Sequence, residues 1–405
     1  MCTEEVVLVD LFDPGYLLYN NNYTEPIEHV LDISKKYYSR NLPFTYIMCF
    51  CDSSCSPEAQ ELFHGASIQY LEGLRNGSKI VSDSSMAAIL YSIKQDIDAL
   101  NLSKILVIMP KNRRAQMDIF VDYLFTDLYK FTFQPFEIQA EKDSLNCTSG
   151  KKHVGDDISH GNLRDITVRS IRTHLETLPA LKGNIVILKS YLIPETNFLH
   201  GFTTRTGGIS YVPTLSSLNL FSSSKRRDPR EVVAENFRRL GKAAGFDPKT
   251  YVSVKVDHAS DVWIMGKSEP DSYDGIVTNQ KGVTIAAPGA DCIPMLFCDP
   301  VRKACGAAHS EFFWNVGAFC HRTFRMIRFR TGARMSLSAP PATQTSFSLM
   351  CGMASISGHR LDSYQLENNC TSAARPHKAI TGDNEEVESF APDILLLVAA
   401  RKTNK

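Results

Sequence analysis

The chain has 405 residues, which is enough for two domains that each bury a core of their own. Its 22% of charged residues sum to a formal net charge of zero, which argues against nucleic-acid or membrane binding driven by overall charge. No apolar stretch approaches the roughly 20 residues that span a bilayer. The acidic start, MCTEEVVLVD, is unlike a secretory signal, so we expect a cytoplasmic protein, with organelle association left open, whose eleven cysteines are free thiols.

The first part of the chain alternates strand-like and helix-like runs. Buried strands are predicted over Val6–Phe12, Phe44–Phe50 and Lys104–Met109, and helices over Thr24–Tyr38, Met86–Leu102 and Met117–Tyr129. This alternation is typical of an α/β layer domain with parallel strands, which we place at residues 1–140. Because no G-x-G-x-x-G turn follows any strand, a structural or regulatory role, with contacts to protein partners, is favoured over a dinucleotide site.

A cluster of cysteines after the second strand admits two interpretations. Cys49, Cys51 and Cys55, followed by His64, could take part in metal or redox chemistry. The cluster contains no C-x-x-C pair, and no second pair accompanies it. Incidental strand and loop cysteines are therefore the favoured interpretation.

The composition changes between residues 141 and 162, where the chain becomes charged and nearly free of large apolar residues. We interpret this stretch as a linker to a second α/β domain over residues 163–309. The predicted elements of that domain are a helix at Leu163–Leu178, a strand at Ile185–Leu188 and a helix at Pro229–Gly245. A basic loop, Lys225–Arg230, precedes the last helix and is typical of a solvated loop.

The second domain opens with the run HGFTTRTGGIS. Its paired glycines, Gly207 and Gly208, suit a tight turn that directs backbone N–H groups and the Arg205 guanidinium toward an anion. A hairpin turn with a surface arginine explains the same pattern equally well.

Three side chains in this domain could hold a zinc ion, namely His258, Cys292 and His309. A catalytic zinc site takes three such ligands and keeps the fourth tetrahedral position open. Spacing alone does not establish the site, because a lone histidine or cysteine is more often a core residue than a ligand.

The sequence motifs around these three residues are more specific than their spacing. HGFTTRTGGIS, SLNL, Asp274-Gly275, GADCIPMLFCDP and GAAH follow one another in the order and spacing of the polyphenol oxidase-type, or laccase-domain, proteins. Over residues 1–309 the chain resembles the animal members of this family. The resemblance implies that His258, Cys292 and His309 are metal ligands.

The same resemblance implies an activity. Family members are expected to be zinc-dependent purine nucleoside phosphorylases that convert adenosine, inosine, guanosine and methylthioadenosine, with phosphate, to a free base and ribose 1-phosphate or its methylthio analogue. Adenosine deaminase activity and a role in the purine metabolism of innate immune cells are implied with it. Our hypotheses for further roles are that Arg205 holds the phosphate and that Asn219 hydrogen-bonds the sugar or the base. A multicopper oxidase is not expected, because the chain has no H-x-H pair.

The family pattern is not recognisable from Ser310 to Lys405. Five arginines, from Arg322 to Arg334, occur there without one acid, and Met335–Gly358 carries no charge at all. Apart from a weak strand pattern at Ile394–Val398, no periodicity persists. We expect an incomplete catalytic domain at 163–309 followed by a divergent, poorly ordered tail at 310–405. The alternative is a catalytically inactive form that acts as a binding or regulatory module.

Overall fold

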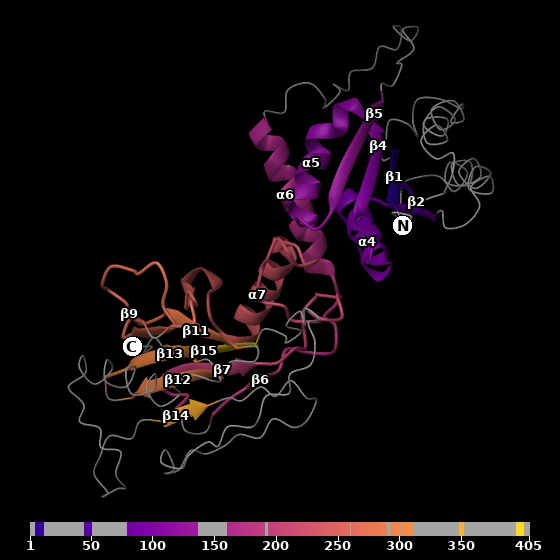
Figure 1. Ribbon diagram of the computed structural model, residues 1–405. Helices are drawn as coiled ribbons and strands as arrows, with labels where there is room; N and C mark the ends of the chain where they lie inside the picture. The colour runs from indigo at the N-terminus through magenta and orange to yellow at the C-terminus, as the bar shows by residue number, and fades with distance from the viewer. Residues whose placement is uncertain are drawn as a thin grey trace, which may run out of the picture. The chain divides into compact units, whose positions relative to one another are not determined.

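The computed structural model describes residues 5–11, 44–50, 79–136, 160–190, 193–259, 261–289, 293–300, 302–310, 348–351 and 394–400. Its contacts divide the chain into two compact units. Unit 1 comprises Met1–Pro179 with Ser222–Glu235, and unit 2 comprises Ala180–Phe221 with Asn236–Lys405. Each unit has its own strands and its own core (Figure 1).

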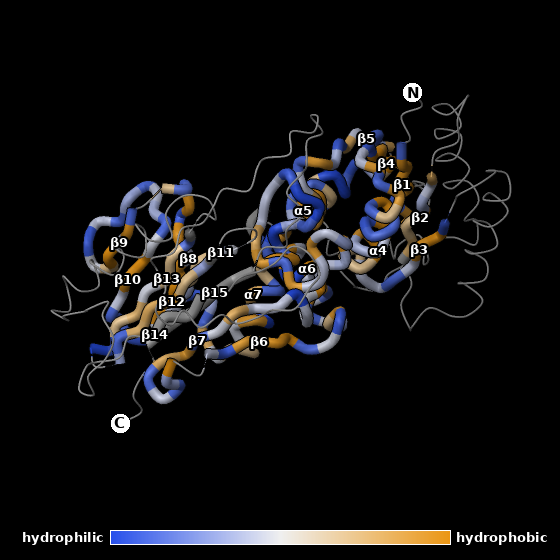
Figure 2. Tube along the Cα trace, turned by 60° about the horizontal axis from the view of Figure 1, so that its bottom comes forward, coloured by the Kyte–Doolittle hydropathy of each residue, from blue (hydrophilic) through white to orange (hydrophobic). Residues whose placement is uncertain are grey.

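Unit 1 contains a five-stranded sheet in the order β3-β2-β1-β4-β5. Its strands are β1 (Glu5–Leu11), β2 (Phe44–Phe50), β3 (Lys79–Asp83), β4 (Lys104–Pro110) and β5 (Lys130–Phe136). Every neighbouring pair is parallel, which confirms the predicted α/β class. The apolar runs of β1 and β4 lie inside the sheet and are almost fully buried. Figure 2 shows the hydrophobic residues of these strands.

The helices of unit 1 differ from the predicted ones mainly at their ends. They are α4 (Met86–Ala99), η1 (Lys111–Arg113), α5 (Arg114–Leu124) and α6 (His160–Thr177). The prediction of one helix over Met117–Tyr129 was wrong at its C-terminal end, because α5 ends at Leu124 and strand β5 begins at Lys130. The predicted helix Thr24–Tyr38, and also Cys51, Cys55 and His64, lie outside the described residues, whereas Cys49 is buried in β2.

A buried ion cluster attaches the segment Ser222–Glu235 to α4 within unit 1. Lys94 is fully buried, and its ammonium lies 2.7 Å from Asp98. Burial lowers the pKa of Lys94, and the carboxylate of Asp98 opposes that shift. Arg227, from the loop predicted to be solvated, lies 2.7 Å from the second oxygen of Asp98. This loop is therefore held by charge pairing at Arg227.

Unit 2 contains two five-stranded sheets, ordered β14-β12-β13-β10-β9 and β6-β7-β15-β11-β8. The first sheet consists of β9 (Val262–Ile264), β10 (Gly275–Thr278), β12 (Ile293–Asp299), β13 (Ala304–Ser310) and β14 (Ser348–Cys351). The second consists of β6 (Ile187–Leu188), β7 (Phe198–Thr203), β8 (Tyr251–Ser253), β11 (Thr284–Gly289) and β15 (Ile394–Ala400). One apolar cluster draws Phe202 and Ile285 from the second sheet and Leu296 from the first, so the sheets pack face to face.

One α-helix and one short 3-10 helix contribute to unit 2. Helix α7 (Arg230–Ala244) crosses the boundary between the units after Glu235, and η2 (Pro248–Thr250) follows it. Within unit 2, Phe237 and Leu240 of α7 pack with Ala286 of β11 in a second apolar cluster. None of the helices in the described ranges combines the length and apolarity that crossing a membrane requires.

Strand β15 comes from the segment that we expected to be poorly ordered. It pairs antiparallel with β7 on one side and with β11 on the other, so it is an inner strand of its sheet (Figure 1). The weak strand pattern at Ile394–Val398 is thereby confirmed as a strand. Apart from β14 and β15, residues 311–405 lie outside the described residues.

Backbone conformation and close packing require glycine at both positions of the HGFTTRTGGIS pair. Gly207 has φ +91°, a left-handed conformation that side chains disfavour. At Gly208, a Cβ atom would overlap the carbonyl oxygen of Ser217. The turn is held to Leu181 by two backbone hydrogen bonds, of 3.0 Å from Gly207 and 2.8 Å to Gly208.

Gly208→Ala is expected to lower the free energy of unfolding of unit 2 by about 3 kcal/mol, because backbone atoms must move to admit a methyl group. Gly266→Ala is the matched control, since no atom lies within 4 Å of its Cβ position and only its φ of +95° is unfavourable. We expect it to cost about 1 kcal/mol. Urea denaturation measures both, and equal losses would contradict the packing argument.

Candidate metal site

His309 is held in place by Asp274. It lies near the end of β13, buried to 6% exposure, and its backbone N–H donates to the carbonyl oxygen of Asp274 at 2.7 Å. Its ring Nδ1 lies 3.1 Å from Asp274 Oδ1. The two residues meet because Asp274 immediately precedes β10, which pairs with β13 through Gly275 and Ala308. Both the position and the ring orientation of His309 are therefore set by one aspartate.

The second oxygen of Asp274 holds the loop that carries His258. Asp274 Oδ2 accepts a hydrogen bond of 2.8 Å from the backbone N–H of Ala259. The backbone N–H groups of Asp274 and Gly275 both donate to the carbonyl of Asp261, at 3.0 Å each. His258 itself is exposed, with φ +60°, so its backbone adopts a conformation that few residue types favour.

The two imidazoles meet edge to face, with ring centroids 5.1 Å apart and an interplanar angle of 67°. With Nδ1–H of His309 directed at the carboxylate, its Nε2 is the nitrogen that carries a lone pair for a metal. Asp274 is nearly fully buried, which by itself raises its pKa. Its hydrogen-bond partners, the ring of His309 first among them, outweigh that effect and lower the pKa of Asp274 to about 2.

The two histidines and their supporting aspartate are suited to binding zinc. Two neutral imidazoles are zinc ligands of the ordinary kind, and a carboxylate on the far nitrogen of one of them is the usual supporting group. Within the described ranges no group of three His, Cys, Asp or Glu side chains could hold a metal ion. The third predicted ligand, Cys292, lies outside those ranges.

Strand register nonetheless locates the residue that follows Cys292. β12 begins at Ile293, which pairs with Ser310, and Pro294 pairs with His309. The strand that directly follows Cys292 in sequence thus begins beside the second histidine. Cys292 as the third ligand is a proposal that this register supports.

Arg205 has a guanidinium that protein groups satisfy only in part. One terminal nitrogen, Nη2, donates to the carbonyl of Thr214 at 3.0 Å. Its Nε is buried and has no hydrogen-bond partner among the described residues, and burial lowers the pKa of the side chain. No hydrogen bond or ion pair joins Arg205 to the histidine pair within the described part of the chain.

Asn219 is buried, and its side-chain oxygen accepts a hydrogen bond of 3.1 Å from Phe221 N–H. A residue that the sequence did not single out, Asn236 of α7, connects the two motifs. It accepts from Ile209 N–H at 2.8 Å and donates to the carbonyl of Asn219 at 2.8 Å. Asn236 carries no sequence signal of its own, because its partners are at least 17 residues away.

Comparisons with known proteins agree with the motifs. A family described as multi-copper polyphenol oxidoreductase laccase matches residues 199–337, a range that includes all three predicted ligands and extends past His309. The chain is 48% identical over 310 residues to purine nucleoside phosphorylase LACC1 of Homo sapiens, covering 76% of this chain and 70% of that protein. The corresponding protein of Mus musculus is 50% identical with the same coverage. The chain therefore belongs to the laccase-domain family that includes these enzymes.

More distant relatives carry the same enzyme name. A purine nucleoside phosphorylase of Deinococcus radiodurans is 38% identical over 143 residues, which are 35% of this chain and 54% of that protein. Among solved structures, YlmD from Geobacillus stearothermophilus matches with 22% identity and a TM-score of 0.35, covering 42% of this chain and 62% of that one.

Proposed function

We propose that the chain is a zinc-dependent purine nucleoside phosphorylase that acts on adenosine, inosine, guanosine and methylthioadenosine, with adenosine deaminase activity as well. The observation that carries this proposal is Asp274, whose two carboxylate oxygens hold the ring of His309 and the loop of His258. A carboxylate in that position is what a histidine metal site requires. The names of the curated relatives support the choice of reaction.

His258, Cys292 and His309 would hold the zinc ion. Zinc in such a site supplies a Lewis acid and lowers the pKa of coordinated water to near neutrality. The contribution of Asp274 is to keep the proton of His309 on Nδ1 and the ring oriented, since it accepts a hydrogen bond from that nitrogen.

In phosphorolysis, a phosphate oxygen forms a bond to C1′ of the ribose while the bond from C1′ to the base nitrogen breaks. The base leaves with the electron pair and takes up a proton, so the products are a free base and ribose 1-phosphate. The transition state has cationic character on the sugar, and a held phosphate stabilises it. We assign phosphate binding to Arg205, whose Nε is buried without a partner among the described residues, and sugar or base contact to Asn219.

The domain organisation, location and biological role belong to the same proposal. We propose an N-terminal domain at 1–140 that serves structural or regulatory contacts and a linker at 141–162. The catalytic domain, expected at 163–309, corresponds in this proposal to unit 2, which excludes α6 and includes β15 as an inner strand. A cytoplasmic location, with organelle association left open, and a role in the purine metabolism of innate immune cells belong to the same proposal.

The test is a measurement of zinc content together with release of hypoxanthine from inosine. We expect the purified chain to contain zinc and to release the base only when phosphate is present. Conversion of adenosine to inosine in the absence of phosphate would report the deaminase activity. Protein that contains no zinc and releases no base would instead support the inactive form that acts as a binding or regulatory module.

Arg205→Gln is expected to raise the KM for phosphate by about 10- to 100-fold, the range that the loss of one charged hydrogen-bond donor produces. The KM for inosine should change much less, because the guanidinium is assigned to the anion. Initial rates at saturating inosine and varied phosphate measure the effect. Lys242→Gln is the control, since it removes one exposed positive charge from α7 of the same unit. An unchanged phosphate dependence in Arg205→Gln would refute the assignment.

A further inference from the structure

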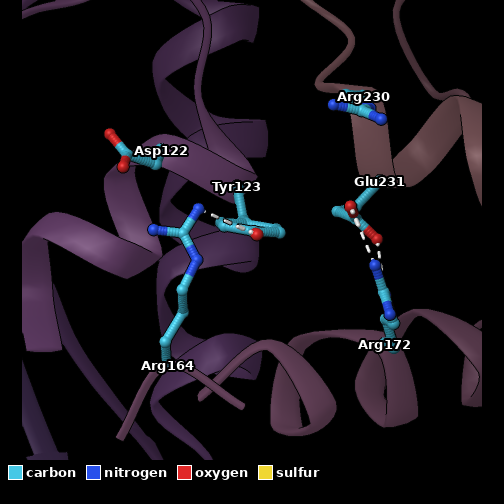
Figure 3. Close-up of a pocket in the computed structure, with 6 residues that line it drawn as sticks. All are labelled: Asp122, Tyr123, Arg164, Arg172, Arg230 and Glu231. Carbon is cyan, nitrogen blue, oxygen red and sulfur yellow. Dashed lines mark hydrogen bonds and ion pairs between the residues drawn. The ribbon is translucent and has the colours of Figure 1, made fainter. Parts of the chain in front are cut away.

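We propose that a pocket in unit 1, separate from the histidine pair, binds a small phosphomonoester such as a pentose phosphate. The pocket has a volume of about 220 Å³. Six residues line it: Asp122, Tyr123, Arg164, Arg172, Arg230 and Glu231 (Figure 3). All of them belong to unit 1.

Three helices supply these side chains. Asp122 and Tyr123 stand in the last turn of α5, and Arg230 and Glu231 are the first two residues of α7. Arg164 and Arg172 both come from α6, where a spacing of eight residues places them on one face. Figure 3 shows the guanidinium of Arg164 beside Tyr123, whereas that of Arg172 reaches Glu231. The pocket is thus formed by side chains far apart in sequence.

Two of the three arginines lack a carboxylate partner in the described part of the chain. Arg172 is paired, because its Nε and Nη2 lie 2.9 and 3.5 Å from the oxygens of Glu231. Arg164 donates only to the phenol oxygen of Tyr123, at 3.1 Å, with its guanidinium carbon 5.3 Å from the ring centroid. The guanidinium of Arg230, which is exposed, forms no hydrogen bond or ion pair with any described residue. With Arg172 paired to Glu231, the lining retains two guanidinium groups and the carboxylate of Asp122, so its three arginines and two acids leave a net charge of +1.

The position of Arg230 is unfavourable for its own helix. The first turn of a helix attracts negative charge, and a cation there costs a few tenths of a kcal/mol to about 1 kcal/mol. An anion bound beside Arg230 would offset that cost.

The chemistry of the lining favours a phosphomonoester over other anions. Guanidinium groups bind phosphate oxygens through paired N–H donors, and a phosphomonoester is close to a dianion at neutral pH. Asp122, which has no ion pair among the described residues, can accept hydrogen bonds from the hydroxyls of a sugar. The volume lies below the roughly 300 Å³ at which pockets for drug-sized ligands begin, so the organic group must be small. These features together fit a pentose phosphate.

The experiment titrates the full chain with ribose 5-phosphate by isothermal titration calorimetry. Inorganic phosphate and ribose are titrated separately, to distinguish the contribution of the phosphate from that of the sugar. We expect ribose 5-phosphate to bind more tightly than inorganic phosphate, and ribose to show no binding. Arg164→Gln and Arg230→Gln should each weaken the binding of ribose 5-phosphate at least about tenfold.

Two controls separate this pocket from other sites. Arg169→Gln removes an exposed charge from the same helix without touching the pocket and should leave binding unchanged. The titrations are repeated in an Arg205→Gln background, which weakens the proposed phosphate site of unit 2, and the binding lost in Arg164→Gln and Arg230→Gln should persist there. Thermal melting of each variant verifies the fold. The proposal is overturned if ribose 5-phosphate does not bind, if Arg164→Gln and Arg230→Gln leave its affinity unchanged, or if only a long polyanion such as heparin binds.

Discussion

Replacing His258 with asparagine is expected to lower the zinc affinity of the protein and the rate of base release from inosine by more than about 100-fold, which exceeds the usual effect of losing a supporting residue. The substitution removes one of the two neighbouring imidazoles. Asparagine tolerates the φ of +60° at this exposed position, so the backbone should keep its conformation. Zinc is measured by mass spectrometry after dialysis, and the rate is measured with phosphate in excess.

Two further variants show whether the effect belongs to a metal site. Asp274→Asn should reduce zinc affinity by about 10- to 100-fold, because it weakens the support of His309 without removing a ligand. His153→Asn, which changes a histidine outside the pair, should have no effect. A His258→Asn protein that keeps its zinc and its activity would exclude the proposed ligand set.

Leu396→Pro is expected to lower the free energy of unfolding of unit 2 by about 3 kcal/mol or more. Leu396 pairs with Phe202 of β7 and with Ala287 of β11, so both neighbours of β15 depend on its backbone. Proline removes an N–H donor and does not fit an inner strand. Hydrogen exchange of peptides from β7 and β11 is the direct measurement, and both should lose protection.

Thr403→Pro is the matched control for this prediction, because residue 403 follows the end of β15 at Ala400. It should leave the exchange of β7 and β11 unchanged. Equal exchange in the Leu396→Pro protein and the unsubstituted chain would show that β15 does not stabilise the sheet in solution.

The sequence predicted the inner strands of unit 1 well and its edge strands poorly. β1, β2 and β4 are predominantly apolar, as expected of strands buried on both faces, although β1 includes the buried Asp10. β5 alternates exposed and half-buried residues, includes Pro135 and lies at the edge of the sheet. Its pattern is weaker than that of the inner strands, and for this reason the predicted helix was extended over the residues that precede it.

In the candidate metal site, too, local motifs predicted some features and missed others. His258 and His309 were proposed from motifs whose order resembles a known family, and the structure brings their rings together. Asp274 was noticed only as part of a motif, because the hydrogen bond that gives it a role spans 35 residues. The ion pair between Arg227 and Asp98 spans 129 residues and was likewise beyond local pattern. The role of Cys292 stays a prediction.

Apolar periodicity and ordered motifs are local properties of a chain, so the sequence alone indicated the α/β class and the family, and from it His258, Cys292 and His309 are predicted as ligands. Which side chains and strands come into contact depends on the tertiary structure. The fold joins Asp274 to the ring of His309 and to the backbone of Ala259, puts the strand Ile394–Ala400 between β7 and β11, and gathers three arginines from two helices into one pocket. Such encounters depend on strand register and helix packing, which are set by the burial of the whole core and not by the residues that meet.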